Sequence, residues 1–383
     1  MALGKINIRN YNKHTDRTRV ESLERRCEVG PEESASFIVD TMGDPICRVR
    51  NSPKYKVLVA ELNEELVGVI QGTIKIVTIP LCNKQALLGY ILGLRVSPLH
   101  RRMGIGFGLV REMEEWFVKN HVDFAYMATE MDNEASVKLF TDKLQYIKFR
   151  TPSILVNPVS YHSKRLSSSV KIVKVKIEHA ERLYRLFIGK TELFPQDIDR
   201  ILKNKLSLGT WIAYRKDDSR RDFDFNQSFP TSWAMLSVWN SGQLFKLKVS
   251  NPSLACLTYS KSTSLIDRFF PCFKLSFLPN VFQPFGFYFM FGLYQEGPKS
   301  GSLMHSLCQL VHNMGMKCED CKVVVTEVAG SDTSRLHIPH SKPLSCPEDL
   351  WCIKALRNED KQTLFDLTKT PHPRTIFVDP REV

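Results

Sequence analysis

The chain has 383 residues, of which 43% are hydrophobic and 25% charged, and it carries a formal net charge of +12. This composition excludes general disorder, and the length suits two domains, since single cores rarely grow beyond about 250–300 residues. No apolar run approaches the ~20 residues of a membrane span, no signal-peptide pattern opens the chain, and the ten cysteines lack the regular spacing of a small secreted domain. We expect a soluble intracellular protein.

The first 150 residues alternate between strand and helix patterns. Apolar, β-branched runs indicate strands, and apolar residues at helical spacing indicate helices. The predicted elements, in chain order, are a strand at 5–9, a helix at 16–27, a hairpin of strands at 55–60 and 66–70, a strand at 87–96, a helix from 104 to about 120, a strand at 124–128, a short helix at 133–143 and extended segments from 147 to 156.

The second half repeats this order of elements. A strand at 171–175 and a helix at 179–188 match the opening, and a strand at 285–294, a helix at 303–314 and a strand at 322–328 match the later part. Residues 157–170 contain proline and a serine run and read as a linker. We therefore predict a first domain at 1–156 and a second, degenerate copy of it at 171–383.

The strongest chemical signal is the segment 92–106, in which a strand leads through a basic loop into a helix. The first amides of a helix have no intrahelical partner and bind anions well. Gly104 and Gly106 let the backbone approach phosphate oxygens, and Arg101 and Arg102 add charge-assisted contacts. A dinucleotide-binding loop is disfavoured because GxGxxG is missing. The segment predicts a pyrophosphate site, which the second copy lacks after Gln295.

These residues resemble a known signature. Arg101-x-x-Gly104-x-Gly106 is similar to the acetyl-CoA motif of the GNAT superfamily, and the similarity extends to Val96-Ser97-Pro98 and to the segment from Asn133 to Phe140. The whole chain resembles, more narrowly, the plant HOOKLESS-type N-acetyltransferases. The resemblance implies the GNAT fold, of α/β (α+β) class, in which a mixed and mostly antiparallel sheet is flanked by helices, with a second GNAT-like domain. It also implies acetyl-CoA as co-substrate.

The resemblance further assigns residues to the cofactor. The backbone of Leu94 and Val96 is expected to pair with the pantetheine arm, and the N–H of Val96 to face the thioester oxygen. The cofactor-binding residues implied in this way are Leu94, Arg95, Val96, Arg101, Arg102, Met103, Gly104, Ile105, Gly106, Asn133, Ser136 and Phe140.

The catalytic positions depart from the family pattern. Many GNAT enzymes carry a tyrosine as general acid where this chain has Phe140, and some histone-acetylating relatives carry a glutamate where it has Tyr90. A lysine amine, with a pKa of about 10.4, needs a base or a desolvating pocket before it can attack a thioester. We expect Glu130, at the end of the next strand, to be the base. Weaker alternatives are Tyr126, His100 and His121.

Direct acetyl transfer to an amine, on histones or other regulatory proteins, is the function that follows. The resemblance implies a nuclear or nucleocytoplasmic regulator of plant growth and hormone response. The alternative is a catalytically weak or inactive acetyl-CoA-binding module that acts through protein partners. A third interpretation of the sequence is a basic nucleic-acid-binding protein, although the sequence contains no nucleic-acid-binding motif. A single CxxC motif does not indicate a metal site. The segment 28–52 is either a lid over the acceptor site or a loop. The sequence leaves the oligomeric state open.

Overall fold

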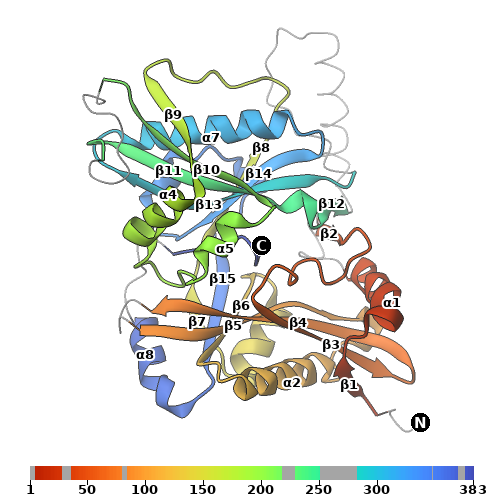
Figure 1. The fold of residues 1–383 in the computed structure, drawn as a ribbon. Helices are drawn as coiled ribbons and strands as arrows, with labels where there is room; N and C mark the ends of the chain where they lie inside the picture. The colour runs from red at the N-terminus through yellow and green to blue at the C-terminus, as the bar shows by residue number, and fades with distance from the viewer. Residues whose placement is uncertain are drawn as a thin grey trace.

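The computed structural model describes residues 5–27, 36–79, 84–217, 229–250, 283–346, 348–369 and 376–383. Two main sheets face each other across a shared core, as Figure 1 shows. The helix α2 (Ile105–Lys119) covers the outer face of the first sheet, and α7 (Ser300–Met316) covers the outer face of the second. Two shorter helices, α4 (Ile177–Leu183) and α5 (Ile198–Lys203), pack in the shared core. The helix-flanked α/β arrangement is the one predicted.

The first sheet has seven strands in the order β1-β3-β4-β5-β6-β15-β7. All neighbouring strands in it are antiparallel except β5 and β6, which run parallel. The sheet is therefore mixed and mostly antiparallel, as predicted. Its strands are β1 (Asn7–Asn10), β3 (Lys54–Leu62), β4 (Glu65–Ile79), β5 (Lys84–Val96), β6 (Phe124–Glu130), β7 (Ile147–Arg150) and β15 (Asp349–Ala355).

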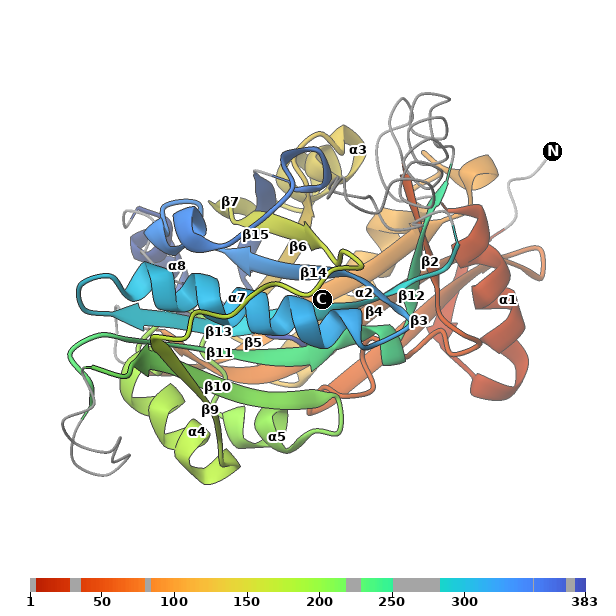
Figure 2. The same ribbon diagram turned by 90° about the horizontal axis from the view of Figure 1, so that it is seen from above.

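The second sheet has six strands in the order β8-β14-β13-β11-β10-β9, and only β13 and β14 run parallel. It repeats the topology of the first sheet, and Figure 2 shows α7 lying across it. A separate antiparallel pair joins β2 to β12, so that each half contributes one strand. These strands are β8 (Ser153–Pro158), β9 (Val170–Val175), β10 (Ser207–Arg215), β11 (Trp233–Asn240), β13 (Gly286–Glu296), β14 (Cys321–Val328), β2 (Ser36–Asp40) and β12 (Lys246–Ser250).

The sheets exchange strands across the predicted domain boundary. β15 comes from the C-terminal part of the chain but lies between β6 and β7 in the first sheet, while β8 forms an edge of the second. A division into 1–156 and 171–383 therefore does not describe the sheets. β15 is apolar on both faces: Leu350 and Cys352 pack under the outer helices, and Trp351 and Ile353 face the shared core. Such a pattern identifies a central strand but not its partner.

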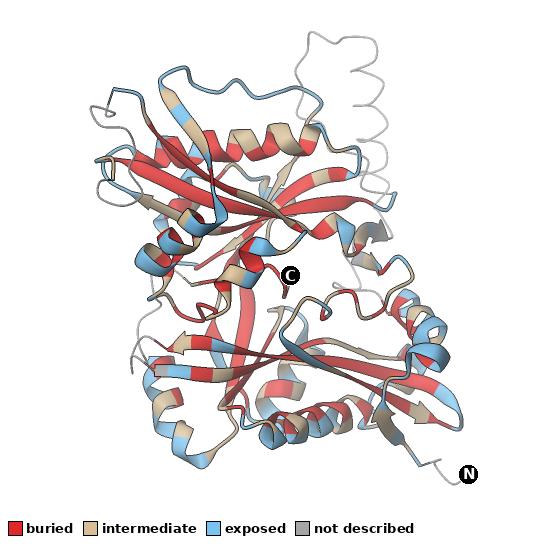
Figure 3. Ribbon diagram, viewed as in Figure 1, coloured by how far each residue is buried: buried red, intermediate tan, exposed pale blue. Residues whose placement is uncertain are grey.

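The helix α2 packs closely on the first sheet because small residues line its contact. A Cβ atom at Gly72 would lie 2.4 Å from the sulfur of Met113, and one at Gly89 would lie 2.8 Å from the ring of Phe117. Figure 3 shows the buried strands of both sheets and the exposed outer sides of the helices. This close approach fixes where α2 begins relative to β4 and β5.

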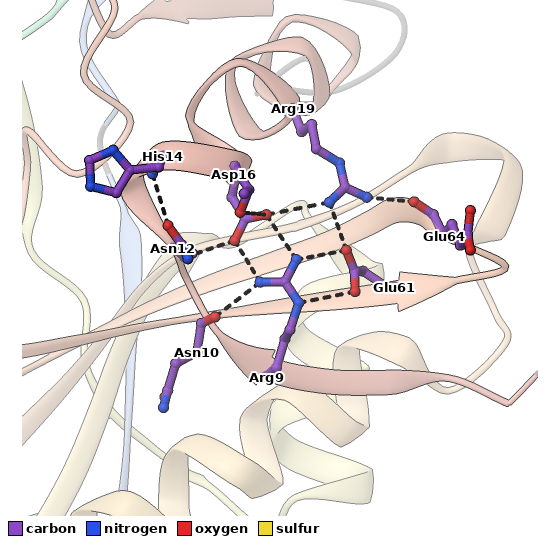
Figure 4. A network of polar contacts seen from close by, with 9 residues as sticks. Arg9, Asn10, Asn12, His14, Asp16, Arg19, Glu61 and Glu64 are labelled. Carbon is purple, nitrogen blue, oxygen red and sulfur yellow. Dashed lines mark hydrogen bonds and ion pairs between the residues drawn. The ribbon is translucent and has the colours of Figure 1, made fainter.

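An ion-pair network anchors the N-terminal elements to the sheet (Figure 4). Arg9 of β1 contacts Asp16 of α1 (Lys13–Arg26) at 2.6 Å and Glu61 of β3 at 2.7 Å, and Arg19 reaches the same Glu61 oxygen at 2.7 Å. The Arg9 guanidinium lowers the pKa of the buried Asp16 carboxyl to about 2. The network therefore holds α1 across the first sheet, beside the end of β5.

The remaining helical segments are short. No helix in the described ranges is long and apolar enough to cross a membrane. The predicted helix at 133–143 is α3, which continues into a π-helical turn. The helix α4 likewise continues into a π-helical turn. These segments are α3 (Glu134–Lys138), α8 (Lys361–Lys369), the π-helical turns Leu139–Lys143 and Tyr184–Ile188, and the 3-10 turns Pro98–His100, Ser241–Gln243, Thr333–His337, Lys342–Leu344 and Asn358–Asp360.

Candidate active site

The two parallel strands at the centre of the first sheet separate partway along their length. β5 and β6 pair from Leu88 with Phe124 to Ile91 with Met127, and no pairing between them follows. Beyond that point β5 continues along β4, and β6 continues along β15. The strands therefore part within the sheet, which we call the opening, and beyond it their facing backbone groups are not paired with each other.

A bulge in β5 lies at the start of this opening. Leu92 pairs with Gln71 and Arg95 with Val69, so two residues of β5, Gly93 and Leu94, face a single residue of β4. Gly93 has φ +59°, a left-handed conformation that favours glycine. A bulge leaves the extra residue outside the ladder of hydrogen bonds and re-aims the strand. Backbone groups are thus turned toward the opening.

The predicted phosphate loop leads into α2 as expected. Gly104 is the N-cap of α2 with φ +81°, and apart from the adjoining backbone no atom of the described residues lies within 4 Å of the position that a Cβ would take. Arg101 and Arg102 are exposed beside it, and the helix amides from Ile105 onward open the first turn. An open helix start flanked by two guanidinium groups fits a pyrophosphate, through hydrogen bonds and the helix dipole.

Not every predicted cofactor residue presents its side chain. Ile105 is 1% exposed and packs in the outer core, together with the half-buried Met103. The Arg95 guanidinium donates to Glu24 of α1 at 3.0 Å and to the carbonyl of Leu94 at 3.1 Å. Ile105 and Arg95 can therefore contribute to a ligand site only through the backbone, while their side chains hold α2 and α1 in place.

On the other side of the opening, α3 brings the remaining predicted residues together. The side chain of Asn133 accepts a hydrogen bond from the N–H of Ser136 at 3.2 Å and so caps α3. Phe140 is buried and packs edge-on against Tyr146, with ring centroids 5.1 Å apart. Burial, followed by the nearby Glu114, holds the pKa of Tyr146 well above its usual value. Tyr146 lies in the same buried cluster as Phe140.

Two stacked tyrosines form the second-last pair of β5 and β6 before the opening. The rings of Tyr90 and Tyr126 are 4.6 Å apart and 28° from parallel, on the face of the sheet that points to the second half. Burial raises the pKa of both phenols above their ordinary value. Tyr90 consequently stays protonated at neutral pH, so that it can donate a hydrogen bond but cannot act as a general base.

Carboxylates gather on the same face at the end of β6. Glu130 is half-buried and lies opposite Asp349 of β15, while Glu327 of β14 accepts a hydrogen bond from the indole of Trp351 at 3.1 Å. Burial, and then Asp132, raise the pKa of Glu130. Burial and Asp349 raise the pKa of Glu327. We call Glu130, Asp349 and Glu327 the carboxylate group; its position favours a cationic ligand.

Asp349 gives the carboxylate group a measurable pH dependence. Burial, with a smaller contribution from Glu130, raises its pKa to about 7, so the folded state binds this proton more tightly than the unfolded chain. Its contribution to stability therefore falls as pH rises from about 4 to 7. We expect Asp349→Asn to gain unfolding free energy relative to wild type between pH 5 and pH 8, measured by urea denaturation.

Glu112 of α2 offers a matched control for this prediction, because its side chain is exposed to solvent. The Glu112→Gln variant should differ from wild type by the same small amount at both pH values. An Asp349→Asn variant whose stability difference from wild type does not change between the two pH values would contradict the assignment.

The second half retains the bulge, and a small cavity lies beside it, lined in part by Gly292, Leu293 and Glu327. Gly292 in β13 has φ +60°, and the register with β11 shifts beside it, as at Gly93. A Cβ at Gly292 would lie 2.0 Å from the hydroxyl of Tyr184, which donates to Ser237 at 2.7 Å. The side chain of Tyr184 thus occupies the space on one side of this bulge.

Three buried polar residues near the opening were not indicated by any motif. Lys75 of β4 contacts Glu382 at 2.6 Å. Gln71 lies four residues before Lys75, on the same face of that strand. Polar residues at alternate positions 71, 73 and 75 interrupt an otherwise apolar strand, and this spacing was a usable signal for a polar strip. Nothing in the sequence pattern placed Glu382 beside them.

Comparison with known proteins agrees with this geometry. The family described as "Acetyltransferase (GNAT) family" matches residues 18–146, the region that holds the opening and the phosphate loop. The structure of Saccharomyces cerevisiae N-myristoyltransferase with bound myristoyl-CoA is similar in fold, with a TM-score of 0.55 and 11% identity over 93% of this chain and 80% of that one. The fold and the site define a GNAT-type acyltransferase with two GNAT-like halves.

Relatives that are similar over nearly the whole chain show to which family of GNAT-type acyltransferases it belongs. The Arabidopsis thaliana protein named "Probable N-acetyltransferase HLS1" is 47% identical over 98% of this chain and 99% of its own length. The rice protein named "Acetyl transferase GW6a" is 34% identical over 98% of this chain and 97% of its own length. The chain belongs to the HLS1 family of N-acetyltransferases, and acetyl-CoA is its co-substrate.

Proposed function

We propose that the protein transfers the acetyl group of acetyl-CoA directly to a lysine amine of a basic protein, with histones as the leading substrate class. The observation that carries this proposal is the coincidence, in the first half alone, of three features: the opening between β5 and β6, the bulge at Gly93 and the open helix start at Gly104. Together these features can accommodate the pantetheine arm, the thioester and the pyrophosphate of acetyl-CoA.

Support for a cationic acceptor comes from the local charge. The whole chain has a net charge of +12 and repels basic substrates at long range, yet the carboxylate group lies at the inner side of the opening. Coulomb attraction at a few ångströms exceeds the screened repulsion of distant surface charges. A lysine side chain, with its flexible stem and point charge, suits such a recess.

Each step of the proposed acetyl transfer can be assigned to particular residues of this chain. We assign the pyrophosphate to the α2 amides with Arg101 and Arg102, and the thioester oxygen to the backbone N–H of Val96, which would stabilise developing negative charge. Glu130 would take the proton that converts the ammonium to a nucleophilic amine, and Tyr90 would donate a hydrogen bond. A thiolate leaves with thiol-like acidity, so Phe140 in place of a general acid is tolerable.

For the cellular setting, we propose a nuclear or nucleocytoplasmic protein that regulates plant growth and hormone response. The support is the family resemblance over nearly the whole chain, including the relative named HLS1. A fluorescent fusion in plant cells tests the location, and exclusion from the nucleus would contradict it.

The general base is tested by Glu130→Gln. We expect this change to lower kcat on a histone-tail peptide about 100-fold or more, the usual range for loss of a general base, while acetyl-CoA affinity stays unchanged. Steady-state kinetics at several pH values, with calorimetry of acetyl-CoA binding on the same samples, provide the measurement. The matched control is Glu134→Gln on the exposed start of α3.

The outcomes separate the proposal from its alternative. Wild-type protein that binds acetyl-CoA but acetylates no histone, lysine peptide or polyamine would favour the regulatory module that acts through protein partners. Unchanged kcat in Glu130→Gln, with transfer intact in the wild type, would remove Glu130 from the mechanism without removing the activity.

A further inference from the structure

An open cavity lies on the second half, at the start of α7. Its volume is about 830 Å³, which is within the usual range of small-molecule binding sites. Three separate segments border it: residues 165–168 of the connection between β8 and β9, the first turns of α7, and the end of the 3-10 turn Thr333–His337. No residue that was assigned above to acetyl-CoA or to the carboxylate group is among those that line it. The cavity is therefore separate from the candidate active site.

The titratable side chains around this cavity are all basic. The exposed residues Arg165, Lys299, His305 and His337 line it, and no aspartate or glutamate is among its lining residues in the described part of the chain. Neither Arg165 nor Lys299 has an ion-pair partner among the described residues. A concave surface with charges of one sign concentrates ions of the opposite sign. The cavity therefore favours an anionic ligand.

The cavity lies where the second half has its counterpart of the phosphate loop. β13 leads into α7 as β5 leads into α2, and each strand has a bulge with a left-handed glycine, at Gly292 and Gly93. The N-cap of α7 is Lys299 with φ +63°, where α2 has Gly104 with φ +81°. The first amides of a helix have no intrahelical partner. An anion in the cavity would thus meet the same end of a helix as the pyrophosphate in the first half.

Contacts along α7 hold two of the basic residues in place. A Cβ at Gly301 would lie 2.4 Å from the ring of His337, so this ring packs directly on the first turn of α7. The side chain of Asn313 accepts a hydrogen bond from the N–H of Lys164 at 2.7 Å and donates one to the carbonyl of Lys164 at 2.8 Å. Figure 2 shows the connection that contains Lys164 crossing α7 on its way to β9. Arg165 therefore follows a backbone that is fixed to α7.

Two leucines give the lining an apolar part. Leu336 is 79% exposed and Leu166 is 37% exposed, and both border the cavity. Apolar side chains that are exposed to water lower the free energy when a ligand covers them. A bare phosphate ion would contact the basic residues alone, whereas a phosphate ester with a ring would also cover the leucines. The lining therefore favours a ligand with an anionic end and an apolar end.

We propose that this cavity binds a nucleoside phosphate, whose phosphate group contacts Lys299, Arg165 and the first amides of α7. The base of the nucleotide packs on Leu166 and Leu336, and the two histidines are further donors. Charge-assisted hydrogen bonds from guanidinium and ammonium groups are strong contacts to phosphate. The basic residues come from three segments that are far apart in the sequence. The loop after Gln295 therefore gives no indication of such a site.

Calorimetry on the full chain tests this site, with AMP and inorganic phosphate as probes. CoA is present at saturation, so that the phosphate loop of the first half is occupied. AMP should bind once per chain and about 5-fold more tightly than inorganic phosphate, because only AMP covers the leucines. Lys299→Gln and Arg165→Gln should each weaken AMP binding about 10-fold or more, the range expected for a lost contact between a charged group and phosphate.

Two further variants separate the contribution of the phosphate from that of the base. Lys317→Gln removes an exposed ammonium group at the other end of α7 and should change AMP affinity less than about 2-fold, because salt screens distant surface charges. Leu336→Ser should weaken AMP binding about 3-fold and leave the affinity for inorganic phosphate unchanged. All four substituted side chains are exposed, so every variant should unfold at the wild-type temperature.

The outcomes distinguish a specific site from general surface charge. Weaker AMP binding in Lys299→Gln and Arg165→Gln, with Lys317→Gln unaffected, supports the site. So does a second CoA molecule per chain that is lost in Lys299→Gln, because CoA itself contains a nucleoside phosphate. A chain that binds one CoA and no AMP overturns the inference, and so does AMP binding that both substitutions leave unchanged. Equal affinities for AMP and inorganic phosphate would overturn the contact of the base with the leucines.

Discussion

Replacing Gly104 by aspartate is expected to reduce acetyl-CoA affinity at least 100-fold, which corresponds to about 3 kcal/mol. Gly104 has φ +81° at the start of α2, and the space around its missing Cβ is open, so a new carboxylate would project where the pyrophosphate is expected. The negative charge would then oppose the ligand at the helix end that otherwise attracts anions. Isothermal calorimetry on the wild type and the variant measures the loss.

The matched control is Gly104→Asn. Asparagine has nearly the same size as aspartate, adopts left-handed conformations more readily than most residues and carries no charge. It should therefore lose less than 10-fold in affinity, while both variants unfold at similar temperatures because Gly104 is exposed. Wild-type affinity in Gly104→Asp would show that α2 does not bind the cofactor, and the assigned phosphate loop would be withdrawn.

Arg150→Met is expected to give the largest loss of stability, about 3–5 kcal/mol, because it strands a buried carboxylate. Arg150 ends β7 in the first sheet, and its guanidinium donates to Glu192 of the second half at 2.6 and 2.9 Å and to the carbonyl of Leu367 at 3.1 Å. The two side chains of the pair are only 3% and 7% exposed. Urea denaturation gives the free energy of unfolding.

The pair between Arg185 and Glu181 serves as the control, since it is a similar arginine contact, at 2.9 Å, on an exposed helix. Arg185→Met should cost less than about 1 kcal/mol. The double variant Arg150→Met/Glu192→Leu should recover most of the loss, because it removes both buried charges. A loss below 1 kcal/mol in Arg150→Met would mean that water reaches Glu192 and that the halves are less tightly joined there.

The second half contributes to the first in ways that resemble neither a linker-joined domain nor a second catalytic unit. It supplies β15 to the first sheet, Glu192 to the buried pair with Arg150, and the segment that carries Glu382. At its own bulge, Tyr184 lies against Gly292. These contributions join the second half to the sheet that carries the candidate site.

Local patterns in the sequence determined most of the first half. The strand, basic loop and helix from Leu92 to Asn120 were predicted nearly to the residue, since periodicity and an N-terminal glycine act over short distances. The GNAT class and acetyl-CoA followed from the motif at Arg101 to Gly106. The repeat of elements in the second half was likewise visible as a repeated order of strands and helices, whereas the bulge at Gly292 came from the structure.

Only the tertiary structure decided which strand pairs with which, and what surrounds the opening. β15 is apolar on both faces, and such a strand fits the centre of either sheet equally well on sequence grounds. The contact of Glu382 with Lys75 and Tyr126 spans more than 250 residues, as the separations of 307 and 256 show. Pattern and propensity carry no information over such distances, because long-range partners are chosen by the packing of complete surfaces rather than by local chain preferences.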